Sequence, residues 1–274
     1  MQFSNSKLTR AEVLARYFPG YQPAAAQTLQ GLSGGGCLIV RDEHRLVLRE
    51  QRASALSHAQ FLRQYRALRR LPESLTATAR FCAAGWMAVD YLPGIVKTRL
   101  PEADALACVL SELHRQPRFG WRVLLLPLLK QYWQTCDPGR RSLGWLRELK
   151  RLAAQGEPQP LRLSPLHMDI HAGNLVYGTD GIRLIDWEYA GDGDIALELA
   201  AVWCEDSNIR YRLVMAYARK VQIEPALLWR QVSRWRPWVL MLMAGWYECR
   251  WQQIGDQQFI TLADEIWRQR RIED

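Results

Sequence analysis

The hydrophobic pattern of this chain changes once, at Pro93-Gly94, and this change restricts the folds that the chain can adopt. Before the break, short hydrophobic segments between turn residues predict the order strand, strand, strand, helix, strand, strand. After the break, hydrophobic residues recur mostly at helical spacing. A length of 274 residues lies at the upper limit of what one core fills. The sequence therefore predicts an α+β fold with two lobes, a small β-rich lobe at residues 1–92 and a larger helical lobe at residues 93–274.

Caps, turns and spacing predict the individual elements. Thr9 and Glu12 have the spacing of a capping box, which begins a short helix that ends near Pro19-Gly20. In the first lobe we expect a hairpin at 38–49, a helix at 58–71, and strands at 81–84 and 86–91. In the second lobe we expect helices at 102–115, 124–135 and 143–154, a loop at 154–165, a hairpin at 174–186, and helices from residue 195 onward.

Composition and charge narrow the class of protein. Hydrophobic residues make up 49% and charged residues 23% of the chain, which excludes a disordered or fibrous protein. The net charge of +8 favours anionic partners such as nucleotides. Nucleic-acid binding stays open as an alternative, but the cations are spread along the chain and interleaved with tryptophan and leucine. We therefore expect no nucleic-acid partner.

The cysteines and the apolar segments bear on location. The six cysteines are scattered without a Cys-x-x-Cys pair, which is typical of a reducing compartment. Residues 1–20 lack the apolar core of a signal peptide, and the longest apolar stretch, 237–247, is too short to span a membrane. The sequence predicts a cytoplasmic monomer with no membrane partner.

One loop and the hairpin after it carry the residues that indicate chemistry. Asp169 and Asn174 lie five positions apart in the loop, and Asp186 follows twelve positions later at the end of the hairpin. A hairpin of that size brings Asp186 beside Asn174, so that both oxygens can face one cation. Oxygen ligands of this kind suit Mg²⁺. Asp169 then remains available to accept the proton of an attacking hydroxyl.

Two other interpretations of this loop remain open. An Asp-rich loop is often a turn held by side-chain hydrogen bonds. The spacing His167-x-Asp169-x-His171 is also compatible with a zinc site, although a zinc site needs further His or Cys nearby and the chain has only five histidines.

The same residues resemble the phosphotransferase motif of the aminoglycoside and choline kinases. That motif corresponds to the stretch from His167 to Asn174 and to Ile185-Asp186-Trp187-Glu188. Upstream, the turn Ser33-Gly34-Gly35-Gly36 is similar to the glycine-rich turn with which these kinases cover nucleotide phosphates. The resemblance spans essentially the whole chain and implies a two-lobed protein-kinase-like fold, with ATP and Mg²⁺ as cofactors.

Four segments resemble one bacterial branch of this family, the thiamine kinases. They are 61–68, 116–121, 165–174 and 191–200. This resemblance implies transfer of phosphate from ATP to the hydroxyl of thiamine, giving thiamine phosphate. A choline-type or aminoglycoside-type kinase and a non-catalytic regulator remain the alternatives. An aminoglycoside site should be lined with carboxylates, whereas the residues after Ile195 are rich in aromatic residues and arginine.

Two positions depart from the general kinase pattern. The third strand of these kinases usually ends in a phosphate-binding lysine that pairs with a helix glutamate. Here the strand ends in Arg49, and no lysine occurs between Lys7 and Lys97. By spacing, the glutamate position falls on Gln64. We expect Arg49 to bind the nucleotide phosphates and Gln64 to face it, as a weaker pair.

The remaining candidates support the loop or bind the acceptor. The resemblance implies that Asp194 braces the catalytic loop, and we expect His167 and His171 to be scaffolding within it. Thiamine carries a cationic ring, and cation–π attraction is strongest to tryptophan. Trp187, Trp203 and Trp246 are therefore our candidates for the acceptor site, although core packing explains most tryptophans in the C-terminal segment equally well.

Overall fold

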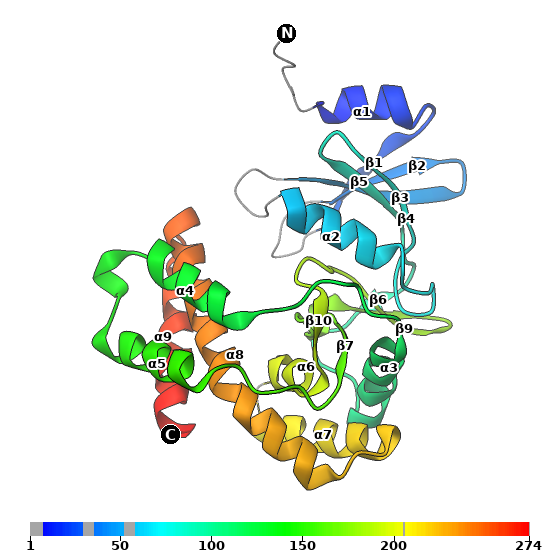
Figure 1. The fold of residues 1–274 in the computed structure, drawn as a ribbon. Helices are drawn as coiled ribbons and strands as arrows, with labels where there is room; N and C mark the ends of the chain where they lie inside the picture. Colours follow the sequence, from blue (N-terminus) through cyan, green and yellow to red (C-terminus); the bar gives the residue numbers. More distant parts are fainter. Residues whose placement is uncertain (1–7, 30–35, 52–57, 205, 274) are drawn as a thin grey trace.

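The computed structural model describes residues 8–29, 36–51, 58–204 and 206–273, and it confirms the predicted fold class. A five-stranded antiparallel sheet with two helices forms the N-terminal part, and a mainly helical part follows (Figure 1). Ser33, Gly34 and Gly35 lie outside the described residues. Within the described part of the chain, no helix is both long and apolar enough to cross a membrane.

The N-terminal sheet is built from hairpins that the sequence predicts. Its strand order is β1-β2-β3-β5-β4, with β1 at Gln22–Leu29, β2 at Gly36–Arg41, β3 at His44–Glu50, β4 at Ala79–Ala83 and β5 at Trp86–Asp90. Asp42 and Gly85 adopt positive φ angles of 54° and 77° in the two hairpin turns. Helix α1 (Arg10–Tyr17) begins at the expected capping box, and α2 is shorter than expected, at His58–Leu68.

The helical part contains seven α-helices within the described residues. They are α3 (Ala103–Arg115), α4 (Leu125–Thr135), α5 (Leu143–Gln155), α6 (Ile195–Ala201), α7 (Ser207–Val221), α8 (Pro225–Ile254) and α9 (Gln257–Glu273). A one-turn 3₁₀ helix, η1 (Pro138–Arg140), connects α4 to α5, and another, η2 (Ala172–Asn174), lies in the candidate site loop. The predicted helices at 102–115, 124–135 and 143–154 are confirmed to within about a residue.

Short strands complete the helical part. The predicted hairpin is β8 (Leu175–Gly178) and β9 (Gly181–Leu184), and β6 (Ile95–Val96) pairs with β8. The sequence pattern missed β6, and it also missed β7 (Leu163–Leu166), which begins inside the predicted loop at 154–165, and β10 (Gly191–Asp194), which pairs with β7. β7 and β10 have only four residues each, and β10 consists of glycine and aspartate, residues that strands usually lack. The division at residues 92 and 93 stays a prediction, although the chain enters the β6–β8–β9 sheet directly after it.

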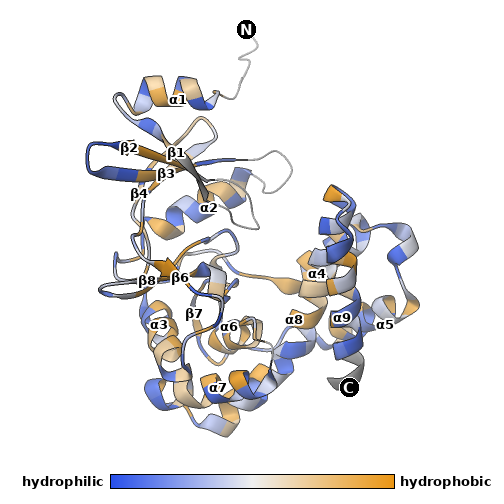
Figure 2. Cartoon of the chain, turned by 180° about the vertical axis from the view of Figure 1, so that it is seen from behind, coloured by the Kyte–Doolittle hydropathy of each residue, from blue (hydrophilic) through white to orange (hydrophobic). Residues whose placement is uncertain are grey.

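Helix α6 lies at the centre of the helical part. All seven of its residues are buried, and α7 and α8 pack against it (Figure 2). The long helix α8 continues from this core toward α4 and α9 and contains Pro237 in its interior. Because α6 is buried on every side, the two carboxylates at its start, Asp194 and Glu198, must be satisfied by protein groups.

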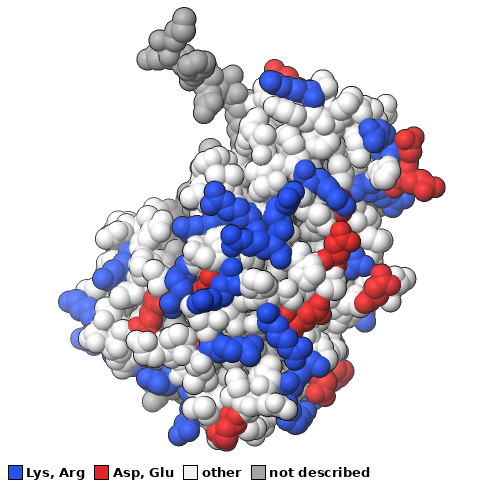
Figure 3. Space-filling model, turned by 45° about the vertical axis from the view of Figure 1, so that its right-hand side comes forward, with Lys and Arg blue, Asp and Glu red and all other residues white. Residues whose placement is uncertain are grey.

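The basic side chains on the face shown in Figure 3 lie over both parts of the molecule, with acidic side chains among them. On this face the positive charge is therefore not confined to a single helix, as it is in proteins that place one helix in a nucleic-acid groove.

Candidate active site

The candidate catalytic loop, residues 167–174, connects β7 to β8 and is held by a buried carboxylate. Glu198 on α6 is 0% exposed and accepts the backbone N–H of His167 at 2.5 Å and that of Met168 at 2.9 Å. Met168 adopts φ of 67°, a left-handed conformation that non-glycine residues seldom adopt. The two hydrogen bonds stabilise this conformation, so Glu198 fixes the path of the loop into Asp169.

Glu198 was not among the residues that we selected from the sequence. Burial opposes its charge, but the nearby His114 ring and the His167 N–H keep the pKa of Glu198 below its ordinary value. Burial lowers the pKa of His114, whose Nδ1 lies 2.6 Å from the hydroxyl of Tyr217. A carboxylate within the apolar helix sequence Ile195–Ala201 is the signal that could have identified it.

We expect Glu198→Gln to reduce the free energy of unfolding by about 2–4 kcal/mol. The amide replaces an acceptor by a donor, which leaves one of the two loop N–H groups without a partner and removes the charge from the other bond. Urea unfolding followed by tryptophan fluorescence measures the change. Glu43→Gln, the same substitution at an exposed turn position, is the control. Equal stability of the two variants would mean that Glu198 does not hold the loop.

Asp194 makes structural contacts at the start of α6. Its carboxylate caps α6 through the N–H of Ala196 at 3.2 Å and accepts from Gln231 at 2.7 Å and from Trp235 at 2.9 Å, both on α8. Asp194 therefore joins α6 to α8. It also accepts the N–H of Leu161 at 3.2 Å and ends β10, which pairs with β7, the strand that leads into the catalytic loop. The direct contact with the loop belongs to Glu198.

The two histidines of the loop are satisfied locally, as expected. Nδ1 of His167 accepts the N–H of Asp169 at 3.2 Å, so its proton is on Nε2, which donates to the carbonyl of Ile185 at 2.9 Å. Burial lowers the pKa of His167, which keeps this ring neutral. Nδ1 of His171 accepts the N–H of Gly173 at 3.1 Å, and a Cβ at Gly173 would lie 2.9 Å from the His171 ring. The loop thus needs glycine at position 173.

The structure brings together the three residues that we expected to carry the chemistry. Asn174 donates through Nδ2 to Oδ2 of Asp169 at 3.0 Å and to its backbone carbonyl at 2.9 Å. The N–H of Ile185 donates to the carbonyl of Asn174 at 3.1 Å, which places the end of the hairpin beside the loop. Asp186 follows with φ of 69°, another left-handed conformation. The hairpin geometry predicted from spacing is therefore correct.

Two carboxyl groups in this site hold their protons unusually tightly. Burial, together with the charges of Asp186 and Glu188, raises the pKa of Asp169 to about 7, while the hydrogen bond from Asn174 opposes the shift. Burial and the charge of Asp186 likewise raise the pKa of Glu188 to about 7. A concentration of buried negative charge of this kind favours a cationic ligand.

Arg49 contacts the site from the N-terminal sheet. Its Nη1 donates to Oδ1 of Asp186 at 3.1 Å. Gly36 pairs with Arg49 across β2 and β3, and a Cβ there would lie 2.6 Å from Val47, so the last residue of the glycine-rich turn has no room for a side chain. Within the described residues, Gln64 on α2 is buried and has no hydrogen bond with Arg49. The structure thus pairs Arg49 with Asp186 and not with Gln64.

The three candidate tryptophans lie in different environments. Trp187 is 1% exposed, and its Nε1 donates to Thr76 at 2.8 Å. Its ring also packs against that of His167 in a tilted contact, with 4.5 Å between the centroids, so Trp187 is a core residue and not an acceptor contact. Trp203 is 38% exposed and lies beside the loop. Its backbone N–H donates to the backbone carbonyl of Ile170 at 2.9 Å.

Trp246 belongs to an aromatic cluster that also contains Trp203, Tyr247 and Phe259. The Tyr247 ring lies 5.9 Å from Trp203, 5.4 Å from Trp246 and 6.1 Å from Phe259. Tyr247 thus lies beside Trp203, whose backbone N–H donates to Ile170 in the loop, and burial and the charge of Asp169 raise the pKa of Tyr247. The sequence analysis missed Tyr247 and Phe259, because single aromatic residues in a helix ordinarily indicate core packing.

Comparison with known proteins shows the family. Residues 29–238 match the phosphotransferase enzyme family. The chain is 60% identical to a thiamine kinase of Salmonella typhimurium and 59% identical to one of Salmonella dublin, each over 98% of both chains.

Solved structures share the fold at low sequence identity. The choline kinase LicA of Streptococcus pneumoniae is 14% identical with a TM-score of 0.69, covering 95% of this chain and 96% of that one. The macrolide 2'-phosphotransferase MphH of Brachybacterium faecium is 17% identical with a TM-score of 0.60, covering 93% and 96%. The chain belongs to the phosphotransferase enzyme family, in the branch that includes the Salmonella thiamine kinases.

Proposed function

We propose that this protein is a thiamine kinase, which transfers the γ-phosphoryl group of ATP to the hydroxyl of thiamine and gives thiamine phosphate. The observation that carries the proposal is 60% identity with a thiamine kinase over 98% of both chains. The site supports it, because its carboxylates, its amide and its arginine are the groups that phosphoryl transfer to an alcohol needs.

Asp169 is the residue proposed to accept the proton of the thiamine hydroxyl. A pKa of about 7 means that the carboxylate is available near neutral pH and is basic enough to take up the proton. The hydrogen bond from Asn174 Nδ2 fixes one of its oxygens and leaves the other for the substrate. The hydroxyl oxygen then attacks the γ-phosphorus, and the bond to the ADP oxygen breaks.

Asn174 and Asp186 are proposed to hold Mg²⁺. With the side-chain nitrogen of Asn174 bonded to Asp169, its side-chain oxygen Oδ1 can face a cation beside the Asp186 carboxylate. No three His, Cys, Asp or Glu residues in the described part of the chain form a metal cluster, so a bound ion must complete its shell with water and phosphate oxygens. Mg²⁺ prefers such a site, and it would neutralise charge on the phosphates.

The N-terminal sheet is proposed to bind ATP. A solved structure of LicA contains AMP, and that protein shares this fold with a TM-score of 0.70. The guanidinium of Arg49 can make a charged, bidentate contact with the phosphates, and the turn Ser33-Gly34-Gly35-Gly36 offers backbone N–H groups. We expect Arg49 to leave Asp186 when nucleotide and metal bind, since Asp186 then binds the metal and the phosphates offer Arg49 stronger partners.

Replacing Arg49 tests this assignment. We expect Arg49→Ala to raise the KM for ATP and lower kcat, together by about tenfold or more, because a charge-assisted bond to phosphate is lost. Arg49→Lys should partly restore both the KM for ATP and kcat, because the lysine ammonium keeps the positive charge but cannot make a bidentate contact with phosphate. Steady-state kinetics measures both constants, with Arg45→Ala, at an exposed position on the same strand, as control. Wild-type constants for Arg49→Ala would remove Arg49 from the nucleotide site. Adding Gln64→Glu to Arg49→Lys then shows whether Gln64 couples to this position.

The aromatic cluster is proposed to bind the thiazolium ring of thiamine. Trp203 and Trp246 offer ring faces for a cation, and the Tyr247 ring contacts both of them. The Glu188 carboxyl hydrogen-bonds to Tyr189, whose hydroxyl accepts Nε1 of Trp246 at 3.0 Å, so Glu188 contributes negative charge beside the cluster when it is ionised. These groups favour a planar organic cation over a polyamine that needs several carboxylates.

An ATP-consumption screen discriminates among the candidate acceptors. Thiamine, choline, ethanolamine and kanamycin are each supplied to the purified protein with Mg²⁺ and ATP. We expect thiamine to give the highest kcat/KM. Faster turnover of choline or kanamycin would favour another kinase of the family, and no turnover of any acceptor would favour a non-catalytic regulator.

A cytoplasmic monomer is part of the proposal. All six cysteines are free in the structure, which is consistent with a reducing compartment. Light scattering after size-exclusion chromatography measures the oligomeric state.

A further inference from the structure

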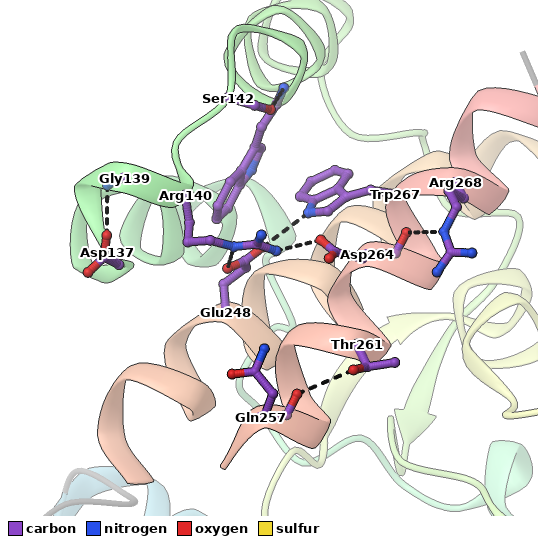
Figure 4. Close-up of polar contacts among 11 residues, drawn as sticks. Asp137, Gly139, Arg140, Ser142, Glu248, Gln257, Thr261, Asp264, Trp267 and Arg268 are labelled. Atoms are coloured by element: carbon purple, nitrogen blue, oxygen red, sulfur yellow. Dashed lines mark hydrogen bonds and ion pairs between the residues drawn. The ribbon is translucent and has the colours of Figure 1, made fainter. Parts of the chain in front are cut away.

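A cluster of one arginine and two carboxylates joins three elements of the helical part. Arg140, at the end of η1, donates through Nε and Nη2 to the two oxygens of Glu248 on α8, each at 2.9 Å. Its Nη2 also donates to Oδ1 of Asp264 on α9 at 2.5 Å. Figure 4 shows the guanidinium between the two carboxylates. We call Arg140, Glu248 and Asp264 the ion-pair cluster.

The ion-pair cluster has a defined geometry because Glu248 is buried. The Glu248 side chain is 1% exposed and also accepts Trp267 Nε1 at 3.4 Å. The hydrogen bonds to Glu248 raise the pKa of Arg140, although its partial burial opposes the shift. A bidentate arginine–carboxylate contact fixes the relative orientation of the two side chains as well as their distance. Arg140 therefore sets the rotation of α8 about its axis at Glu248.

The rotation of α8 at Glu248 decides where Tyr247 points. Neighbouring residues on an α-helix differ in direction by about 100°. With Glu248 turned toward η1, the Tyr247 ring is turned toward Trp203, whose backbone N–H donates to the carbonyl of Ile170 in the loop. The second branch, to Asp264, anchors α9 five residues after Phe259, whose ring packs on Trp246 at 5.8 Å. Both branches thus position members of the aromatic cluster.

In the part of the chain that the structure describes, the side-chain hydrogen bonds of Arg140 are with helices that carry members of the aromatic cluster, and not with the catalytic loop or the N-terminal sheet. Among the described residues Arg140 donates to Glu248 and Asp264, and to none of residues 167–174 or of the N-terminal sheet. The catalytic loop has its own anchor in Glu198. Disturbing the ion-pair cluster should therefore alter binding of the acceptor and leave binding of the nucleotide unchanged.

We propose that Arg140 is a positioning residue for the acceptor, which sets the affinity for thiamine by holding α8 and α9 so that Tyr247 and Phe259 form one wall of its site. This inference rests on the proposed function. It assigns acceptor affinity to a residue that does not touch the acceptor.

Kinetics of two substitutions test the proposal. Arg140→Lys keeps the positive charge but loses the bidentate contact with Glu248. Asp264→Asn keeps the ion pair between Arg140 and Glu248 but weakens the contact between Arg140 and α9. We expect Arg140→Lys to raise the KM for thiamine at least fivefold and Asp264→Asn to raise it about twofold to threefold. The KM for ATP and the slow hydrolysis of ATP without thiamine should stay within twofold of wild type. Arg219→Lys is the matched control, since Arg219 pairs with Asp104 in an exposed contact between α7 and α3.

A binding measurement separates positioning from stability. The dissociation constant of thiamine is measured by tryptophan fluorescence without nucleotide, well below the unfolding temperature of each variant. We expect it to rise with the KM for thiamine. A purely structural role would lower the unfolding temperature and leave this constant unchanged, which would overturn the proposal, as would an equal rise in both KM values.

The wild-type protein distinguishes failure of this proposal from failure of the proposed function. If wild type does not phosphorylate thiamine, the proposed function is wrong, whatever the variants do. If wild type does so and Arg140→Lys keeps its thiamine KM and dissociation constant, only the role of Arg140 is wrong.

Discussion

Asp169→Asn should reduce kcat by about 10²–10⁴-fold while leaving the KM for ATP nearly unchanged. The amide cannot accept the proton of the acceptor hydroxyl, and general-base catalysis contributes about this factor. The amide can still accept the hydrogen bond from Asn174, so the loop keeps its shape. Stopped-time assays of thiamine phosphate measure the loss. Asp180→Asn, in the exposed turn of the β8–β9 hairpin, is the matched control.

The same variant should gain stability at alkaline pH in metal-free buffer. The pKa of Asp169 is about 7 in the folded protein and near 3.8 in an unfolded chain, so folding favours the neutral form. The contribution of Asp169 to stability therefore falls as pH rises from about 4 to 7 and is least favourable above 7. An uncharged amide escapes this penalty, and we expect a gain of up to about 3 kcal/mol at pH 8 and little at pH 4.

Thermal unfolding across this pH range checks the expectation. A variant that keeps half or more of wild-type turnover would show that Asp169 is not the base. A gain in stability that does not depend on pH would show that the carboxylate is not buried beside other charges in the free enzyme.

Asp186→Ala should abolish Mg²⁺-dependent binding of ATP, and Asn174→Ala should weaken it less. A carboxylate holds a divalent cation more strongly than a neutral amide does. Removal of Asp186 also frees Arg49 to contact phosphate directly. We therefore expect Asp186→Ala to bind metal-free ATP at least as tightly as wild type does.

Calorimetric titrations with and without Mg²⁺ measure both effects. Asn174→Ala should also shift the pH dependence of kcat upward, because its side chain donates to Asp169 and holds that pKa down. Unchanged Mg²⁺-dependent affinity in Asp186→Ala would remove Asp186 from the metal site.

The sequence predicted the features that depend on local pattern. The capping box at Thr9 and the hairpin that ends at Asp186 follow from spacing and turn residues alone. The approach of Asn174 to the end of that hairpin is a consequence of hairpin register, which turn length fixes. The fold class followed from the change of periodicity and from the family motif.

Features that depend on packing between distant segments were not predictable. Glu198 contacts a loop 31 positions away, and nothing in its own helix shows which N–H groups it meets. The partner of Arg49 is 137 positions away, and family spacing pointed instead to Gln64. Trp187 and Trp203 look equivalent in the sequence, but one is enclosed between Thr76 and His167 and the other is partly exposed.

Pro237 divides helix α8 into a part that bonds to α6 and a part that carries members of the aromatic cluster. The side-chain bonds described between α8 and α6 or its cap come from Gln231, Trp235 and Arg236, all before Pro237. The aromatic cluster lies wholly after Pro237 apart from Trp203. Substitutions in the aromatic residues after Pro237 can thus change the aromatic cluster and leave these three bonds to α6 and its cap in place. A chimera joined at Pro237 is the natural way to exchange acceptors between enzymes of this architecture.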